Sequence, residues 1–387
     1  MAAPNFIPHF GLPSRLEQMI NVAIGAQLFL LLGFDYFPAA LRLVLAGGIN
    51  LLYIFAIVAY LQRTGDRKDL ILFLPVGIFV FMGLIGLALE QMSQTQNQAS
   101  VLAAVRQLSP YVALIALVIC RREISPALLA ICAFSILASA ALHAVFLPNV
   151  FLNNSQRFAP FSTNLHASGY ALVGTLLLFW FLYTSERLKP VWFILFALVC
   201  LFLLNGNGVR TPILFLLFYL GFEMLLSNPF LRHNRSVILV LCAVTLVAVA
   251  AVAMTIDLSV FNQFSSGRLS NYGERFDLLN QRDLQTLLFG TGPGSDLLKT
   301  STWWWDEKDS HSDVLKILWG GGVLGLIVFL WFWLLVGLRN QGVLLALSLA
   351  LLAASCVSNA YLSRPNSAFL LFAFGAARQA YLERKTA

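Results

Sequence analysis

The chain has 387 residues, of which 59% are hydrophobic and 11% charged, and its mean hydropathy is +0.79. Soluble domains carry about 25% charged residues, so this composition indicates a polytopic membrane protein. The formal net charge is +7, but the basic residues stand in small groups between apolar runs and form no continuous patch. That distribution argues against a nucleic-acid-binding protein.

Apolar runs of the length needed to cross a membrane, roughly 20 residues, follow one another along the chain. They predict an all-α polytopic protein of about twelve transmembrane helices, forming a single integral membrane domain over residues 1–387. The N-terminal segment lacks a signal-peptide cleavage pattern, so the first run should remain as an anchor. The expected helices lie near 17–34, 39–61, 70–89, 101–119, 126–146, 167–184, 190–205, 211–227, 236–256, 314–336, 343–358 and 367–381.

The connections between these runs alternate in character. One set is short and holds Lys or Arg in each member: RTGDRKD, CRREIS, SERLKP, PFLRHNRS, GLRN and the tail LERKTA. By the positive-inside rule this set is cytoplasmic, and an even number of spans then places both termini inside. The other set faces outward and contains one long loop, residues 257–313, of a length that is uncommon without a function. Within it, GERFDLLNQRDLQTLLFG has a helical apolar rhythm and predicts an amphipathic helix on the bundle or at the interface.

Several arginines fall outside the cytoplasmic set. A charge in a membrane helix costs about 2.5–3.5 kcal/mol, so it usually faces a partner or a wet cavity. Snorkelling or pairing with Asp35 and Glu90 would explain Arg42 and Arg106, and solvation would explain some of the others. The alternative is an anionic ligand such as a diphosphate, because a guanidinium group can donate two parallel hydrogen bonds to phosphate oxygens. Arg210 and Arg268 favour that alternative most. The remaining outward arginines are Arg157, Arg275, Arg282 and Arg364.

Two histidines precede apolar runs on the outward side. His311 lies in DSHSD just before a helix expected to start at about Asp313, where Asp309 or Asp313 could orient its ring. A helix start there would also favour a nearby phosphate. His166, in STNLHASGY, has a similar position, and either histidine could instead be a polar cap.

The glycines of LFGTGPGSD lack the ending of a nucleotide-binding P-loop and predict a rigid turn.

SGR in the long loop, a turn of the LFGTGPG kind, and HSxxL before a glycine-containing apolar run together resemble the bacterial O-antigen polymerase and O-antigen ligase superfamily. The motif support covers about residues 210–332. The resemblance implies a GT-C-type helical fold in the bacterial inner membrane, with residues 257–313 as a periplasmic loop. It implies a metal-independent glycosyltransferase that uses an undecaprenyl-diphosphate-linked glycan as donor and needs no cofactor.

The resemblance also assigns residues. Arg210 and Arg268 would bind the diphosphate and His311 would be the catalytic base. From the residues themselves, Arg275, Arg364, His166 and Asp309 are added as candidates for contacts with the diphosphate or the glycan. The acceptor would be a lipid-linked repeat unit for a polymerase or lipid A-core for a ligase, and a chain-length regulator is a possible partner. Ligases often have a tryptophan shortly after SGR, whereas this chain has Tyr272.

We expect a polymerase and keep two alternatives. The first is an O-antigen ligase. The second is a flippase or transporter of the same lipid-linked sugar, which would need charged residues along a path through the whole bundle. Here the unexplained charges gather at the outward side.

Overall fold

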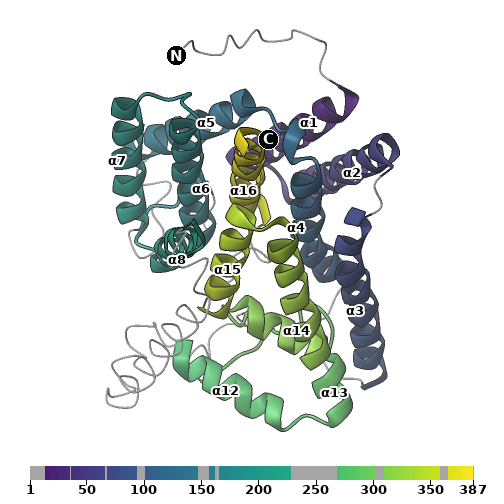
Figure 1. Cartoon of the computed structure of the whole chain (residues 1–387). Coiled ribbons are helices and arrows are strands. Elements are labelled where there is room, and N and C mark those ends of the chain that lie inside the picture. Colours follow the sequence, from purple (N-terminus) through teal and green to yellow (C-terminus); the bar gives the residue numbers. More distant parts are fainter. Residues whose placement is uncertain are drawn as a thin grey trace.

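The computed structural model describes residues 14–34, 36–65, 68–93, 101–146, 157–161, 165–227, 268–301, 309–357 and 365–386. Every regular element in these ranges is a helix, as expected for an all-α protein (Figure 1). The helices are α1 (Arg15–Leu32), α2 (Ala39–Thr64), η1 (Lys68–Leu72), α3 (Phe73–Ser93), α4 (Val101–Ile119), η2 (Arg121–Glu123), α5 (Pro126–Phe146), α6 (Leu165–Thr184), α7 (Pro190–Asn207), α8 (Arg210–Ser227), α12 (Arg268–Asn280), α13 (Leu284–Phe289), α14 (Asp313–Asn340), α15 (Gly342–Val357) and α16 (Pro365–Thr386).

Helices occupy eleven of the twelve expected positions, and the twelfth, 236–256, lies outside the described residues. Within the described ranges, eight helices are long and apolar enough to cross a membrane, and the chain is a multi-pass membrane protein. The apolar stretches Gln107–Ile119 in α4 and Gly342–Cys356 in α15 are shorter. The expected total of about twelve spans stays a prediction.

The centre of the bundle is formed by α6 and α16, which pack against each other. The runs 168–175 of α6 and 368–377 of α16 are buried on all sides. Small residues allow this approach: a Cβ on Gly174 would lie 2.7 Å from the Cβ of Leu370. By contrast, α7 exposes Val191, Ile194 and Phe202, as expected for side chains that face lipid.

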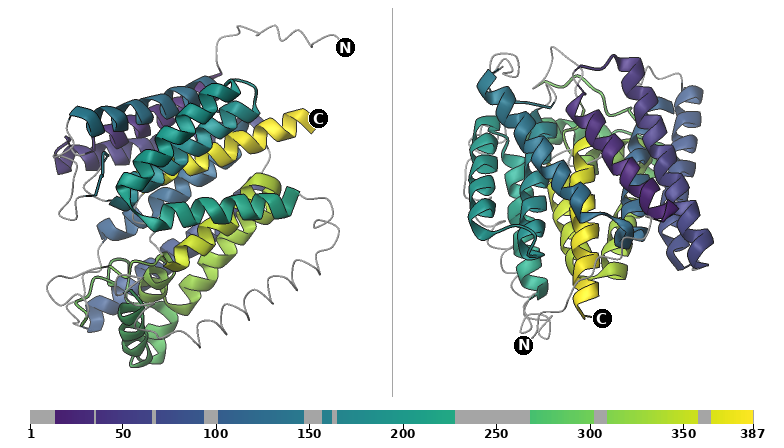
Figure 2. Two further views of the ribbon diagram at one scale, coloured as in Figure 1. Left: turned by 90° about the vertical axis from the view of Figure 1, so that its left-hand side faces the viewer. Right: turned by 90° about the horizontal axis from the view of Figure 1, so that it is seen from above.

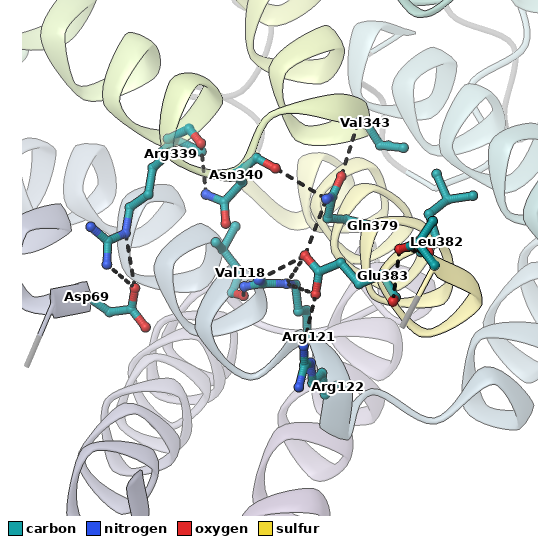
Figure 3. A network of polar contacts seen from close by, with 12 residues as sticks. Asp69, Val118, Arg121, Arg122, Arg339, Asn340, Val343, Gln379, Leu382 and Glu383 are labelled. Atoms are coloured by element: carbon teal, nitrogen blue, oxygen red, sulfur yellow. Dashed lines mark hydrogen bonds and ion pairs between the residues drawn. The ribbon is translucent and has the colours of Figure 1, made fainter. Parts of the chain in front are cut away.

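One end of the bundle carries ion pairs formed by the short basic connections. Arg339 at the end of α14 binds Asp69 at 2.8 Å, and Arg121 binds Glu383 of α16 at 2.9 Å (Figure 3). Arg63 binds Glu123 at 3.0 Å. These three arginines are therefore matched by carboxylates.

The other end carries α12 and α13, which lie far from the C-terminus (Figure 2, left). The single amphipathic helix expected here is divided in two by Asp283, whose side chain accepts the Thr286 N–H at 2.8 Å and caps α13. α13 packs on α14 and α3. α13 thus lies against the bundle directly after α12 in the chain.

Candidate functional site

We call four residues the basic corner: Arg157, which precedes α6, His166 of α6, Arg210 at the start of α8 and Arg268 at the start of α12. The Arg268 guanidinium lies 3.4 Å from Nε2 of His166. Nδ1 of the same ring lies 3.1 Å from Oγ1 of Thr211, the neighbour of Arg210 at the start of α8. The fold thus brings the predicted residues His166 and Arg268 into contact, although they are far apart along the chain, and places Arg210 beside Thr211, the other partner of His166.

The turn between α7 and α8 fixes one side of the basic corner. Gly208 ends α7 with φ of 63°, and Arg157 donates to the carbonyls of Asn207 and Gly208. The buried Asn207 amide donates to Phe158 at 2.7 Å and to the Leu165 carbonyl at 3.0 Å, just before His166. The turn therefore ties the start of α6 to the start of α8.

His311 has an unusual backbone conformation, with φ of 52°. Among the described residues, two other non-glycine residues have positive φ, and both follow the end of a helix: Glu186 after α6 and Gln341 after α14. His311 instead precedes a helix, so helix termination does not account for it. Such strain persists only where the surrounding structure holds it, and it is frequent at functional sites.

Asp309 and Tyr272 hold His311 in place. The Asp309 carboxylate accepts the His311 backbone N–H at 3.2 Å and lies 3.5 Å from Nδ1. The Tyr272 hydroxyl donates to the His311 carbonyl at 3.2 Å. Burial raises the pKa of Tyr272 to about 12 against the opposing effect of Arg268, so the hydroxyl keeps its proton and donates at neutral pH. The His311 side chain remains 26% exposed.

The loop before α14 is held by buried hydroxyls. Ser312 caps α14 by accepting the Leu315 N–H at 3.3 Å and donates to the Ser355 carbonyl at 3.0 Å, so the helix starts at Asp313, as predicted. Ser310 donates to Asp296 through both its N–H and its hydroxyl. Asp313, the alternative partner for His311, is buried and accepts from Ser355. The geometry selects Asp309 as the residue that orients the ring.

α12 joins the basic corner to His311. Arg268 and Tyr272 are four residues apart and lie on the same face of the helix. Arg268 reaches His166 from this face, and Tyr272 reaches the His311 carbonyl. α12 therefore connects Arg268, a predicted diphosphate-binding residue, to the loop that carries the predicted base His311.

Arg275 was predicted to contact the diphosphate, and the structure gives it different surroundings. Its side chain is fully buried, donates to Asn271 at 3.1 Å and to the Asp296 carbonyl at 2.7 Å, and lies 5.9 Å from the Trp319 ring. Burial lowers the pKa of Arg275, opposed by Asp296. We therefore leave Arg275 out of the ligand site, because its guanidinium already holds the backbone of Asp296, whose carboxylate accepts from Ser310 beside His311.

The glycine turn packs into a break in α14. Gly322 has φ of 64° and ψ of −167°, a conformation open almost only to glycine, and it interrupts the helix. Two carbonyls just before the break accept from the turn instead: Trp319 from the Thr291 N–H at 3.1 Å, and Gly320 from the Gly292 N–H at 2.9 Å. The predicted rigid turn, with positive φ at Gly290, Gly292 and Gly294, is confirmed.

Other sequence candidates lie elsewhere or outside the described residues. Arg282 stacks over Trp319 with its guanidinium carbon 3.9 Å from the ring centroid, and burial lowers its pKa to about 10. The Arg42 guanidinium carbon lies 4.6 Å from the Phe34 ring centroid, whereas Asp35 and the side chain of Glu90, its expected carboxylate partners, lie outside the described residues. Arg364 and the side chain of Arg106 lie outside the described part of the structure.

Sequence reasoning missed four polar partners of the site: Thr211, Ser310, Ser312 and Asp296. Thr211, Ser310 and Ser312 are short and uncharged, and Asp296 closely follows the glycine turn. No charge excess or residue spacing in the sequence therefore indicates any of them. It also missed Arg378 of α16, which pairs with Glu223 of α8 and lies 4.0 Å over Trp180. That pair could have been suspected, since both charges stand inside apolar helices.

No protein-family model matches the chain, and no curated protein sequence matches it. Across the described residues, no group of three or more His, Cys, Asp or Glu side chains is arranged to hold a metal ion. The cationic groups at the site are arginines, which bind phosphate oxygens directly. The arrangement offers anion binding beside an oriented imidazole.

Proposed function

We propose that this protein is a glycosyltransferase of the bacterial inner membrane that polymerises undecaprenyl-diphosphate-linked polysaccharide repeat units on the periplasmic side. The observation that carries the proposal is the basic corner, linked by α12 to a histidine that has strained backbone and an oriented ring. The resemblance of SGR, LFGTGPG and HSxxL to O-antigen polymerases and ligases supports the same chemistry. A GT-C-type fold and about twelve spans belong to this proposal.

In this mechanism the arginines bind the leaving group. The diphosphate on C1 of the donor sugar lies between Arg210 and Arg268, which neutralise the charge that grows as the C1–O bond breaks. Fixed positive charge at the leaving oxygens lowers the barrier and needs no metal. Arg364 remains a candidate for a further contact.

His311 removes the proton of the acceptor hydroxyl. Nδ1 faces the Asp309 carboxylate, which assigns the ring proton to Nδ1 and the basic lone pair to Nε2. The hydroxyl oxygen bonds to C1, its proton passes to Nε2, and the electrons of the C1–O bond leave with the diphosphate. A direct displacement of this kind inverts the anomeric centre, which comparing donor and product linkages would test.

In vitro transfer by the purified protein tests the site directly. With a lipid-diphosphate glycan as donor, His311→Ala should lose about 10²–10⁴-fold in turnover, the usual contribution of a general base. Arg210→Ala and Arg268→Ala should also lose turnover. Arg187→Ala, exposed in the α6–α7 connection, is the matched control and should transfer at the wild-type rate. Full turnover by all three folded site variants would show the assignment to be wrong.

The glycans that accumulate in a deletion strain distinguish the two possible acceptors. Loss of a polymerase leaves single repeats attached to the lipid A-core, whereas loss of a ligase leaves polymer on the undecaprenyl carrier. We expect the first result. The second would make this chain an O-antigen ligase with the same donor site.

A further inference from the structure

The contacts of His166 fix where its ring carries a proton. An arginine guanidinium can only donate hydrogen bonds, so Nε2, 3.4 Å from Arg268, must accept. The proton of a neutral ring is then on Nδ1, which donates to Thr211 Oγ1 at 3.1 Å. A ring protonated on both nitrogens would direct an N–H at the Arg268 guanidinium and set two positive charges against each other. The observed arrangement therefore requires a neutral imidazole.

We infer that neutral His166 is a positioning residue that holds Arg268 beside Arg210 for the diphosphate, and that its protonation releases Arg268 and weakens donor binding. This rests on the proposed function and changes the part that His166 plays in it. His166 lies between Thr211 and the Arg268 guanidinium, so it acts through Arg268. One imidazole thereby links α6, α8 and α12.

The charges around His166 make protonation unfavourable for this arrangement. From α12 it faces Arg268, and at the start of α8 Arg210 adjoins Thr211. Arg157 binds the neighbouring α7–α8 turn. Asp309 and His311 lie next to Tyr272, one turn further along α12. A positive charge on the ring would thus enter a cluster that is already cationic, directly against the Arg268 guanidinium.

A pH series of ligand binding tests this inference. The probe is undecaprenyl diphosphate without glycan, bound to the full-length protein in nanodiscs between about pH 8 and about pH 5, the range in which histidines titrate. Wild-type affinity should fall about tenfold more than that of His166→Gln, corresponding to one charge-assisted hydrogen bond. The glutamine amide can accept from Arg268 and donate to Thr211, but it does not titrate. Its residual pH dependence reports the titration of the diphosphate and of the other groups at the site, including His311.

Two further variants separate positioning from folding. His166→Ala should bind the probe about tenfold more weakly at every pH, because Arg268 loses its partner. Thr211→Val should weaken binding, whereas Thr211→Ser, which keeps the hydroxyl, should restore it. All variants are compared at matched thermal stability, measured on the same samples.

The outcomes distinguish this inference from the proposed function. Identical pH profiles for wild type and His166→Gln, or wild-type affinity in His166→Ala, would overturn the positioning role while leaving the donor site in place. Failure of the wild-type protein to bind the probe at any pH would instead remove the proposed function, and the inference with it.

Discussion

Arg268 and Arg275 stand two turns apart on α12, yet their guanidinium groups have different surroundings. Arg268 is half-buried and reaches a histidine across the bundle, whereas Arg275 is fully buried against a backbone carbonyl. Their sequence contexts are alike, since both lie in the same polar loop. The sequence could therefore indicate an excess of arginines here, but it could not tell a ligand-binding arginine from one that holds a loop.

Replacing Arg275 with leucine should destabilise the fold. The change leaves the Asp296 carbonyl and the Asn271 side chain without their donor, at about 1–3 kcal/mol for each unsatisfied group. Thermal unfolding of the purified protein in detergent measures it. Arg268→Leu is the control and should melt close to the wild type. Unchanged melting of Arg275→Leu would contradict a structural role and return Arg275 to the candidate ligand site.

At the scale of elements, α14 is two helical pieces joined at Gly322, and the glycine turn occupies the join. The apolar run predicted one span at 314–336, and a helix does cover it. Hydropathy carries no information on backbone torsion, so the break could not be predicted from it. The short piece before the break begins directly after the loop that carries His311. The turn thus braces that loop against the body of the bundle.

Gly322→Ala should destabilise the protein by about 3 kcal/mol, because its torsion angles exclude a side chain. An added Cβ would also lie 2.3 Å from the Leu288 carbonyl oxygen. Gly321→Ala is a control one residue away, since its added Cβ meets nothing within 4 Å. That variant should keep wild-type stability in the same detergent melt. Equal stability of the two variants would refute the packing described for the join.

For the whole molecule, the apolar runs predict the helices well and their contacts poorly. Eleven expected positions are helical in the structure, because a membrane requires backbone groups to be satisfied within each span. The candidate site depends on contacts between residues 45 and 102 positions apart, from His166 to Thr211 and to Arg268. Charge placement suggested several members of this site, but only the packed bundle brings them together.

The proposed orientation places α12 outside the cytoplasm and the α6–α7 connection inside. Gln281, after α12, and Glu186, after α6, are both exposed and stand at opposite ends of the bundle. In a parent carrying Cys356→Ser and Cys242→Ser, a membrane-impermeant maleimide should label the Gln281→Cys variant in intact spheroplasts. Glu186→Cys should be labelled only after permeabilisation. The reverse pattern would invert the topology and place the basic corner in the cytoplasm.

Replacing His311 with glycine should stabilise the folded state, because histidine adopts this left-handed conformation at a cost of about 1 kcal/mol. At this left-handed φ of 52°, folding favours glycine, whereas the proposed base requires histidine. Among random variants of this gene, those with glycine there should be over-represented when cells are screened only for the amount of intact protein. Histidine should return to the majority only when survival depends on the proposed transferase activity.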